Sequence, residues 1–105
     1  MELEVYWLQL AEDKLSHIYD YYRKTAGKRV ASKLVNGILS STIGLELQPE
    51  IGQIESCLSH RKQEFRYLVF ENYKIVYWVN SKYKRIEIAN VFDTRQNPEK
   101  LIETK

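Results

Sequence analysis

The order of apolar and polar positions predicts a short strand and two helices in the first part of the chain. Residues 2–7 alternate as a strand does. Over residues 8–22 the apolar side chains recur at steps of three and four, which is typical of an amphipathic helix that Gly27 can end. A second apolar stripe predicts a helix over residues 28–43, closed by Gly44. Because the connection is so short, we expect an antiparallel helical hairpin.

Residues 45–62 show no regular period. Pro49 and Gly52 interrupt regular structure, and the scattered apolar side chains are expected to pin the segment to the core: Leu45, Leu47, Ile51, Ile54 and Leu58. A structureless connection of this length is unusual in a compact domain. We therefore expect it to contain a helical turn or a further strand.

The second half of the chain predicts three short strands over residues 64–70, 73–80 and 84–92. Glu71-Asn72 and Asn80-Ser81-Lys82 are the expected turns between them. The resulting order, β-α-α-β-β-β, predicts an α+β fold in which the helical hairpin covers one face of a mainly antiparallel sheet. Residues 1–105 are expected to form a single domain, because a chain of 105 residues has room for one core.

Alternation along residues 73–80 assigns side chains to the two faces of this sheet. The set expected to meet the helices is Tyr73, Ile75, Tyr77 and Val79. The set expected on the opposite, open face is Lys74, Val76 and Trp78, and we expect Arg66 of the preceding strand to point the same way. An exposed face that carries cations and aromatic rings is typical of a binding surface.

Composition and charge favour a globular cytoplasmic protein over a secreted or membrane-spanning one. Apolar residues make up 44% and charged residues 29% of the chain, which is ordinary for a globular protein. Residues 1–56 carry six Lys or Arg against eight Asp or Glu, whereas residues 57–105 carry ten against six, so positive charge gathers on the strand-rich half. The acidic start of the chain argues against a signal peptide, no apolar run is long enough for a membrane span, and a single cysteine suits a reducing cytoplasm.

Three stretches carry a resemblance to a known family: AEDKLSHIYDYY, FRYLVFENYKIVYWV and ANVFDTRQNPEKL. Together with the order of elements, they resemble the RelE/ParE toxin superfamily over nearly the whole chain. The resemblance implies the toxin of a type II toxin–antitoxin system of the plasmid stabilisation type. It also implies a cognate antitoxin that wraps the toxin with its carboxyl-terminal segment.

The superfamily contains two activities on one fold, so the fold alone does not decide between them. RelE-like members resemble ribosome-dependent endoribonucleases that cut messenger RNA, for which Lys74, Arg66 and Arg95 are the candidate catalytic residues here. ParE-like members inhibit DNA gyrase by binding it. The position that carries His in some nucleases is Asp93, and Lys74 lacks the bidentate fork of arginine. We therefore favour a ParE-like inhibitor, with a nuclease and a non-toxic interaction module as the alternatives.

The remaining candidate residues divide into expected partner contacts and expected structural residues. Trp78, Phe92, Asp93 and Tyr22 are predicted to contact a partner, although Asp93 is also expected to contact Arg95 within a local turn. The other reactive side chains, His17, His60 and Cys57, are expected to be surface or packing residues rather than catalytic groups. Their spacing predicts no metal site, and the sequence contains no cofactor motif. The sequence does not decide whether the protein forms a homodimer.

Overall fold

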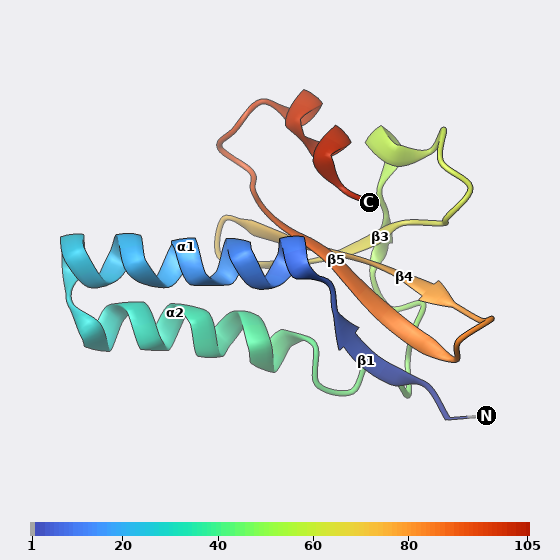
Figure 1. Ribbon diagram of the computed structural model, residues 1–105, viewed down its shortest axis with the longest axis horizontal. Helices are drawn as coiled ribbons and strands as arrows, with labels where there is room; N and C mark the ends of the chain where they lie inside the picture. The colour runs from blue at the N-terminus through green and yellow to red at the C-terminus, as the bar shows by residue number, and fades with distance from the viewer. Residues whose placement is uncertain (1) are drawn as a thin grey trace.

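A computed structural model describes residues 2–105 (Figure 1). The elements follow in the order β1 (Glu4–Trp7), α1 (Gln9–Ala26), α2 (Lys28–Ser41), β2 (Gln53–Ile54), the 3-10 turn η1 (Ser56–Leu58), β3 (Arg66–Phe70), β4 (Tyr73–Asn80), β5 (Arg85–Asp93) and the 3-10 segment η2 (Pro98–Glu103). The predicted strand, helical hairpin and three later strands are confirmed. The connection over residues 45–62 contains both a short strand and a helical turn, as expected.

The five strands form one sheet in the order β1-β5-β4-β3-β2. β1 runs parallel to β5, and every other neighbouring pair is antiparallel. The predicted α+β class with a mainly antiparallel sheet is therefore confirmed. β4 and β5 form the centre of the sheet, and β5 ends at Asp93, beside the middle of α1 in the region that holds the candidate site.

Gly27 alone separates the two helices. Its φ of 100° lies in the region that glycine adopts without steric cost, and its N–H donates to the Tyr22 carbonyl at 3.0 Å. The chain reverses there, so α1 and α2 lie side by side on one face of the sheet (Figure 1). No helix within residues 2–105 is long and apolar enough to cross a bilayer.

The main core lies between the helical hairpin and the sheet. It joins buried residues of α1, α2, the connection that follows α2, and the strands β4 and β5: Ala11, Ile18, Ile38, Leu45, Tyr73, Ile75, Tyr77, Ile86, Ile88 and Val91. Val79 packs against the same cluster from the side. The assignment of Tyr73, Ile75, Tyr77 and Val79 to the helix face is therefore confirmed.

The opposite face of the sheet is covered, and the prediction of an open face is wrong. η1 and η2 lie over it on the side away from the helices (Figure 1). A second core cluster forms beneath them from Leu58, Phe65, Val76, Ala89, Phe92 and Leu101, with Trp78 packed against it. Arg61 fastens the tail by donating to the carbonyls of Ile102 and Thr104. Each face of the sheet thus carries a packed apolar cluster.

A bulge in β5 lets one strand serve both cores. Val76 pairs with Asn90 and Tyr77 pairs with Ile88, which leaves Ala89 as the extra residue. The extra residue shifts the alternation of β5, and fully buried Asn90 donates to the Thr104 side chain at 3.0 Å. The bulge therefore helps to hold the carboxyl-terminal segment against the sheet.

Candidate functional site

A cleft of about 600 Å³ opens between α1 and the end of β5. We call it the α1–β5 cleft. Its lining residues come from α1, from the central strands and from the carboxyl-terminal segment: Lys14, His17, Ile18, Tyr21, Tyr22, Tyr73, Val91, Asp93, Arg95, Gln96, Lys100 and Glu103. Two of the predicted partner-binding residues, Tyr22 and Asp93, therefore lie in one cleft with the predicted phosphate ligand Arg95.

Asp93 and Arg95 form a closed turn at the edge of this cleft. The Asp93 carboxylate accepts from the Arg95 backbone N–H at 2.9 Å and from its guanidinium Nε and Nη2 at 3.1 and 2.9 Å. Asn72 adds a fourth hydrogen bond at 3.0 Å. The side-chain hydrogen bonds of Arg95 lower the pKa of Asp93, and the same contact raises the pKa of Arg95. The predicted Asp93–Arg95 contact is confirmed.

This geometry makes Asp93 a structural anion. A carboxylate that holds four donors and a lowered pKa is a weak proton acceptor near neutral pH. Arg95 keeps its planar charge at the surface, since 63% of its side chain is exposed. A ligand in the α1–β5 cleft can therefore reach the Arg95 guanidinium, and the Asp93 carboxylate holds that guanidinium in a fixed orientation.

Tyr73 contributes a protonated hydroxyl to the floor of the cleft. Burial, together with the neighbouring Tyr22 hydroxyl, raises the pKa of Tyr73 to about 12. The residue therefore acts as a neutral hydrogen-bonding group at physiological pH. The sequence predicted that Tyr73 belongs to the core, and this second role was not predicted. Tyr73 lies beside the cleft because it pairs with Asp93 of β5 in the sheet.

Lys74 lies on the sheet face away from the helices, as predicted. Its ammonium contacts the Glu55 carboxylate at 2.7 Å and sits 4.2 Å from the centre of the Tyr67 ring. Glu55 is buried and also accepts from the Cys57 backbone N–H at 3.2 Å. Lys74 is thus neutralised by a carboxylate from the 45–62 segment. No sequence signal pointed to Glu55, because residues so far apart are joined only by the folded sheet.

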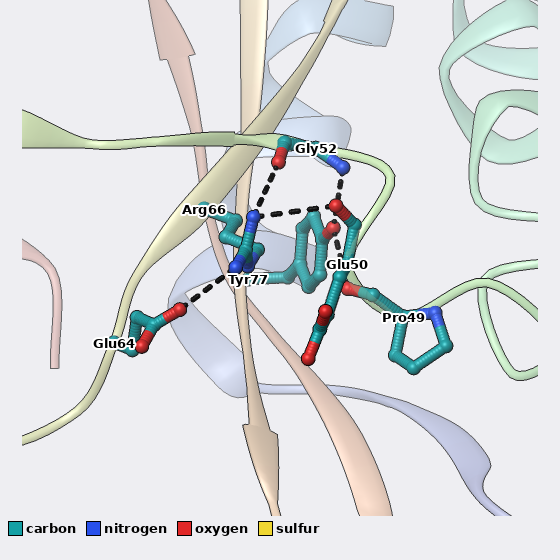
Figure 2. Close-up of polar contacts among 6 residues, drawn as sticks. All are labelled: Pro49, Glu50, Gly52, Glu64, Arg66 and Tyr77. Carbon is teal, nitrogen blue, oxygen red and sulfur yellow. Dashed lines mark hydrogen bonds and ion pairs between the residues drawn. The ribbon is translucent and has the colours of Figure 1, made fainter.

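Arg66 lies on the helix side of the sheet, so its predicted outward direction is wrong. It pairs directly with Tyr77, and residues opposite one another on neighbouring strands share a face. Its guanidinium donates to the carbonyls of Glu50 and Gly52 at 3.2 and 2.9 Å and to the Glu64 carboxylate at 2.8 Å (Figure 2). Arg66 therefore supports the 49–52 loop.

The three cations considered for catalysis do not converge. Lys74 and Arg66 lie on opposite faces of the sheet, and Arg95 lies beyond the end of β5. Each has an acidic partner of its own: Glu55, Glu64 and Asp93, respectively. A catalytic role for these residues stays a prediction, but the structure does not bring them together around one phosphate.

Two of the predicted contact residues, Trp78 and Phe92, are part of the second core. Phe92 is only 2% exposed, and half-buried Trp78 packs edge-on against Phe65 at 6.4 Å between ring centres. Their expected exposure is therefore wrong, because η1 and η2 cover the face that carries them. Their contact with a partner stays a prediction.

The histidines and the cysteine lie in two different places. His17 lines the α1–β5 cleft, so it is nearer to the candidate site than the sequence indicated. His60 and Cys57 lie together in a separate hollow between η1 and η2. Within residues 2–105 no group of three or more His, Cys, Asp or Glu side chains is arranged to hold a metal ion.

Comparison with known proteins assigns the family. A family model described as the ParE toxin of the type II toxin–antitoxin system parDE matches residues 5–98. A solved structure described as a chromosomal ParDE TA system from P. aeruginosa has the same fold, with a TM-score of 0.72 and 23% identity over 88% of this chain and 96% of that chain. No curated protein shows significant sequence similarity to this chain. The chain belongs to the family of ParE toxins of type II toxin–antitoxin systems.

Proposed function

We propose that this protein is a ParE-like toxin that arrests growth by binding DNA gyrase in the cytoplasm, and that a cognate antitoxin neutralises it. The observation that carries the proposal is the separation of Lys74, Arg66 and Arg95, each bound to its own carboxylate. A toxin of this family that lacks a converging cationic site is better equipped to bind a target than to cleave one.

The chemistry of RNA cleavage explains why this separation matters. Attack by a ribose hydroxyl needs a base, cations that meet at the developing phosphorane, and an acid for the leaving oxygen. Lys74 would first have to leave buried Glu55, and Arg66 would have to release two carbonyls of the 49–52 loop. Both steps expose groups whose hydrogen bonds hold the fold together. This cost supports inhibition by binding.

The α1–β5 cleft is the site that we assign to the antitoxin. Its exposed Arg95 and Lys100, with the hydroxyl groups of Tyr21 and Tyr22, suit an acidic peptide that also carries apolar side chains. The partnership itself is supported by the family, whose members belong to toxin–antitoxin systems. Binding there would cover most of the exposed guanidinium of Arg95.

Induced expression in a bacterial host tests this function. The proposal expects growth arrest with a DNA-damage response, rescue by the neighbouring antitoxin gene, and intact messenger RNA. Arg95→Ala should weaken rescue by the antitoxin, whereas Val30→Ser, on the exposed side of α2 and outside the cleft, should not. Normal growth would favour the non-toxic alternative, and translation arrest with cut messenger RNA would favour the nuclease.

A further inference from the structure

The stretch that runs from the end of α2 through β2 exposes several apolar side chains. We call them the 39–54 strip: Leu39, Ile43, Leu47, Ile51 and Ile54. Ile43, Leu47 and Ile51 are 79%, 82% and 61% exposed, although the sequence predicted that Leu47, Ile51 and Ile54 would pin the segment to the core. Scattered apolar residues on a surface are ordinary, but a run of five on one short segment is typical of an interaction site.

The strip is exposed because its other residues are firmly anchored. Thr42, Leu45 and Gly52 are buried, so the segment alternates between anchors and exposed apolar side chains. The Tyr77 hydroxyl accepts from the Gly52 N–H at 2.9 Å and donates to the Pro49 carbonyl at 2.8 Å. Figure 2 shows that Arg66 reaches the same loop.

These anchors set the conformation of the strip before any partner arrives. A β-carbon on Gly52 would lie 2.6 Å from the Tyr77 hydroxyl oxygen and 2.8 Å from the Tyr67 carbonyl oxygen. The loop therefore packs so closely against β3 and β4 that only glycine fits at this position. A surface that is already ordered loses less conformational entropy on binding. The exposed side chains are thus held as a preformed platform.

The charged side chains within the segment that carries the strip are all acidic. Residues 34–60 contain no Lys or Arg, although the whole chain carries a net charge of +2. Glu46 and Glu50 are exposed between the apolar side chains of the strip. Arg66 reaches the loop from below, but its guanidinium is engaged with two carbonyls and Glu64. A partner therefore meets apolar side chains bordered by negative charge.

We propose that the 39–54 strip is a docking surface for an amphipathic protein segment whose apolar side chains are flanked by Lys or Arg. Apolar contact supplies affinity, and charge complementarity selects a basic segment. A second copy of this chain fits less well, because a symmetric contact of this surface with itself would bring the carboxylates of Glu46 and Glu50 from both copies into one interface. An acidic segment would meet like charge there. The surface is distinct from the α1–β5 cleft and goes beyond the function proposed above.

A peptide titration tests the docking surface. A short amphipathic Leu–Lys peptide and its Leu–Glu counterpart are titrated into the isotope-labelled full-length protein, with amide chemical shifts as the readout. The Leu–Lys peptide should shift residues 39–54 and bind at least about tenfold more tightly than the Leu–Glu peptide, with an advantage that shrinks at high salt.

Two pairs of substitutions separate the apolar and the electrostatic contributions. Leu47→Ser with Ile51→Ser should weaken Leu–Lys binding about tenfold or more, since both side chains are exposed and their loss leaves the core intact. Glu46→Gln with Glu50→Gln should remove the preference for the basic peptide. Val30→Ser, an exposed apolar position outside the strip, is the control and should change neither result.

Three outcomes would overturn the proposal. One is equal binding of the two peptides, and another is a set of shifts that lies outside residues 39–54. The third is a dimer in light scattering that Leu47→Ser with Ile51→Ser dissociates, because the occupant would then be a second copy of the chain. None of these outcomes depends on gyrase inhibition, so the test is independent of the proposed toxin activity.

Discussion

Arg66 and Tyr77 face each other across β3 and β4, and both bind the backbone of residues 49–52 with their polar ends. The pair converts an irregular loop into a fixed part of the structure. It also explains why an arginine in a toxin of this family lies away from the predicted cationic face.

Removal of the Tyr77 hydroxyl should destabilise the protein. Tyr77→Phe leaves the Gly52 N–H and the Pro49 carbonyl without their buried partner, which costs about 1–3 kcal/mol of unfolding free energy. Urea denaturation measures this loss. Tyr21→Phe is the matched control, because Tyr21 is exposed on α1, and it should change the unfolding free energy by less than about 0.5 kcal/mol. Equal effects of the two substitutions would contradict the anchoring role of Tyr77.

The Lys74–Glu55 pair should stabilise the fold rather than serve chemistry. Lys74→Ala leaves the buried Glu55 carboxylate without its cation, and we expect a loss of about 2–3 kcal/mol because Lys74 itself is partly exposed. The double variant Lys74→Ala with Glu55→Gln should recover part of that loss. A double-mutant cycle by urea denaturation measures the coupling. Additive losses would show that the two residues stabilise the fold independently.

The Asp93–Arg95 contact predicts a pH dependence with a definite sign. The folded pKa of Asp93 is below its unfolded value, so the unfolded state binds the proton more readily and the contact stabilises the fold above the unfolded pKa of about 4. That stabilisation is lost as the pH falls through the lower, folded pKa. Asp93→Asn should therefore show a shallower loss of unfolding free energy below about pH 4 than the parent protein.

Arg95→Gln should flatten the same part of the profile, since it removes the donor that lowers the pKa of Asp93 most. Urea denaturation at a series of acidic pH values measures all three proteins. If both variants keep the parent's slope, the contact does not contribute to stability in this range.

Gly37 is expected to resist even a small side chain. A β-carbon there would lie 2.0 Å from the Phe70 ring, where α2 packs against β3. Alanine is favoured over glycine in a helix by about 1 kcal/mol, but overpacking costs about 1–3 kcal/mol. Gly37→Ala should therefore destabilise the protein by up to about 2 kcal/mol, and the same change made in a Phe70→Leu background should cost less. A stabilised single variant would contradict this packing.

The sequence predicted the strands and the helical hairpin because their periods are regular. β4 is the clearest case, since Tyr73, Ile75, Tyr77 and Val79 all face the helices as alternation requires. The cover on the other face was not predicted. η2 offers one buried apolar side chain, Leu101, which is too little to form a periodic signal.

That missing cover also explains the misplaced Arg66. Alternation places Phe65 and Tyr67 on the face opposite to that of Arg66. Both belong to the second cluster, on the face that η1 and η2 cover. When both faces of a sheet are packed, alternation separates two sets of side chains but does not say which set meets the helices. The pairing of Arg66 with Tyr77, which only the folded sheet shows, decides the matter.

The central claim is that this ParE-family protein acts by binding DNA gyrase rather than by cleaving RNA. A supercoiling assay with purified gyrase, relaxed plasmid and the full-length protein tests it most directly, with messenger RNA in a ribosome-containing translation reaction assayed in parallel. Our account predicts inhibited supercoiling that the cognate antitoxin relieves, together with intact messenger RNA. Unimpaired supercoiling together with cleaved messenger RNA would contradict it.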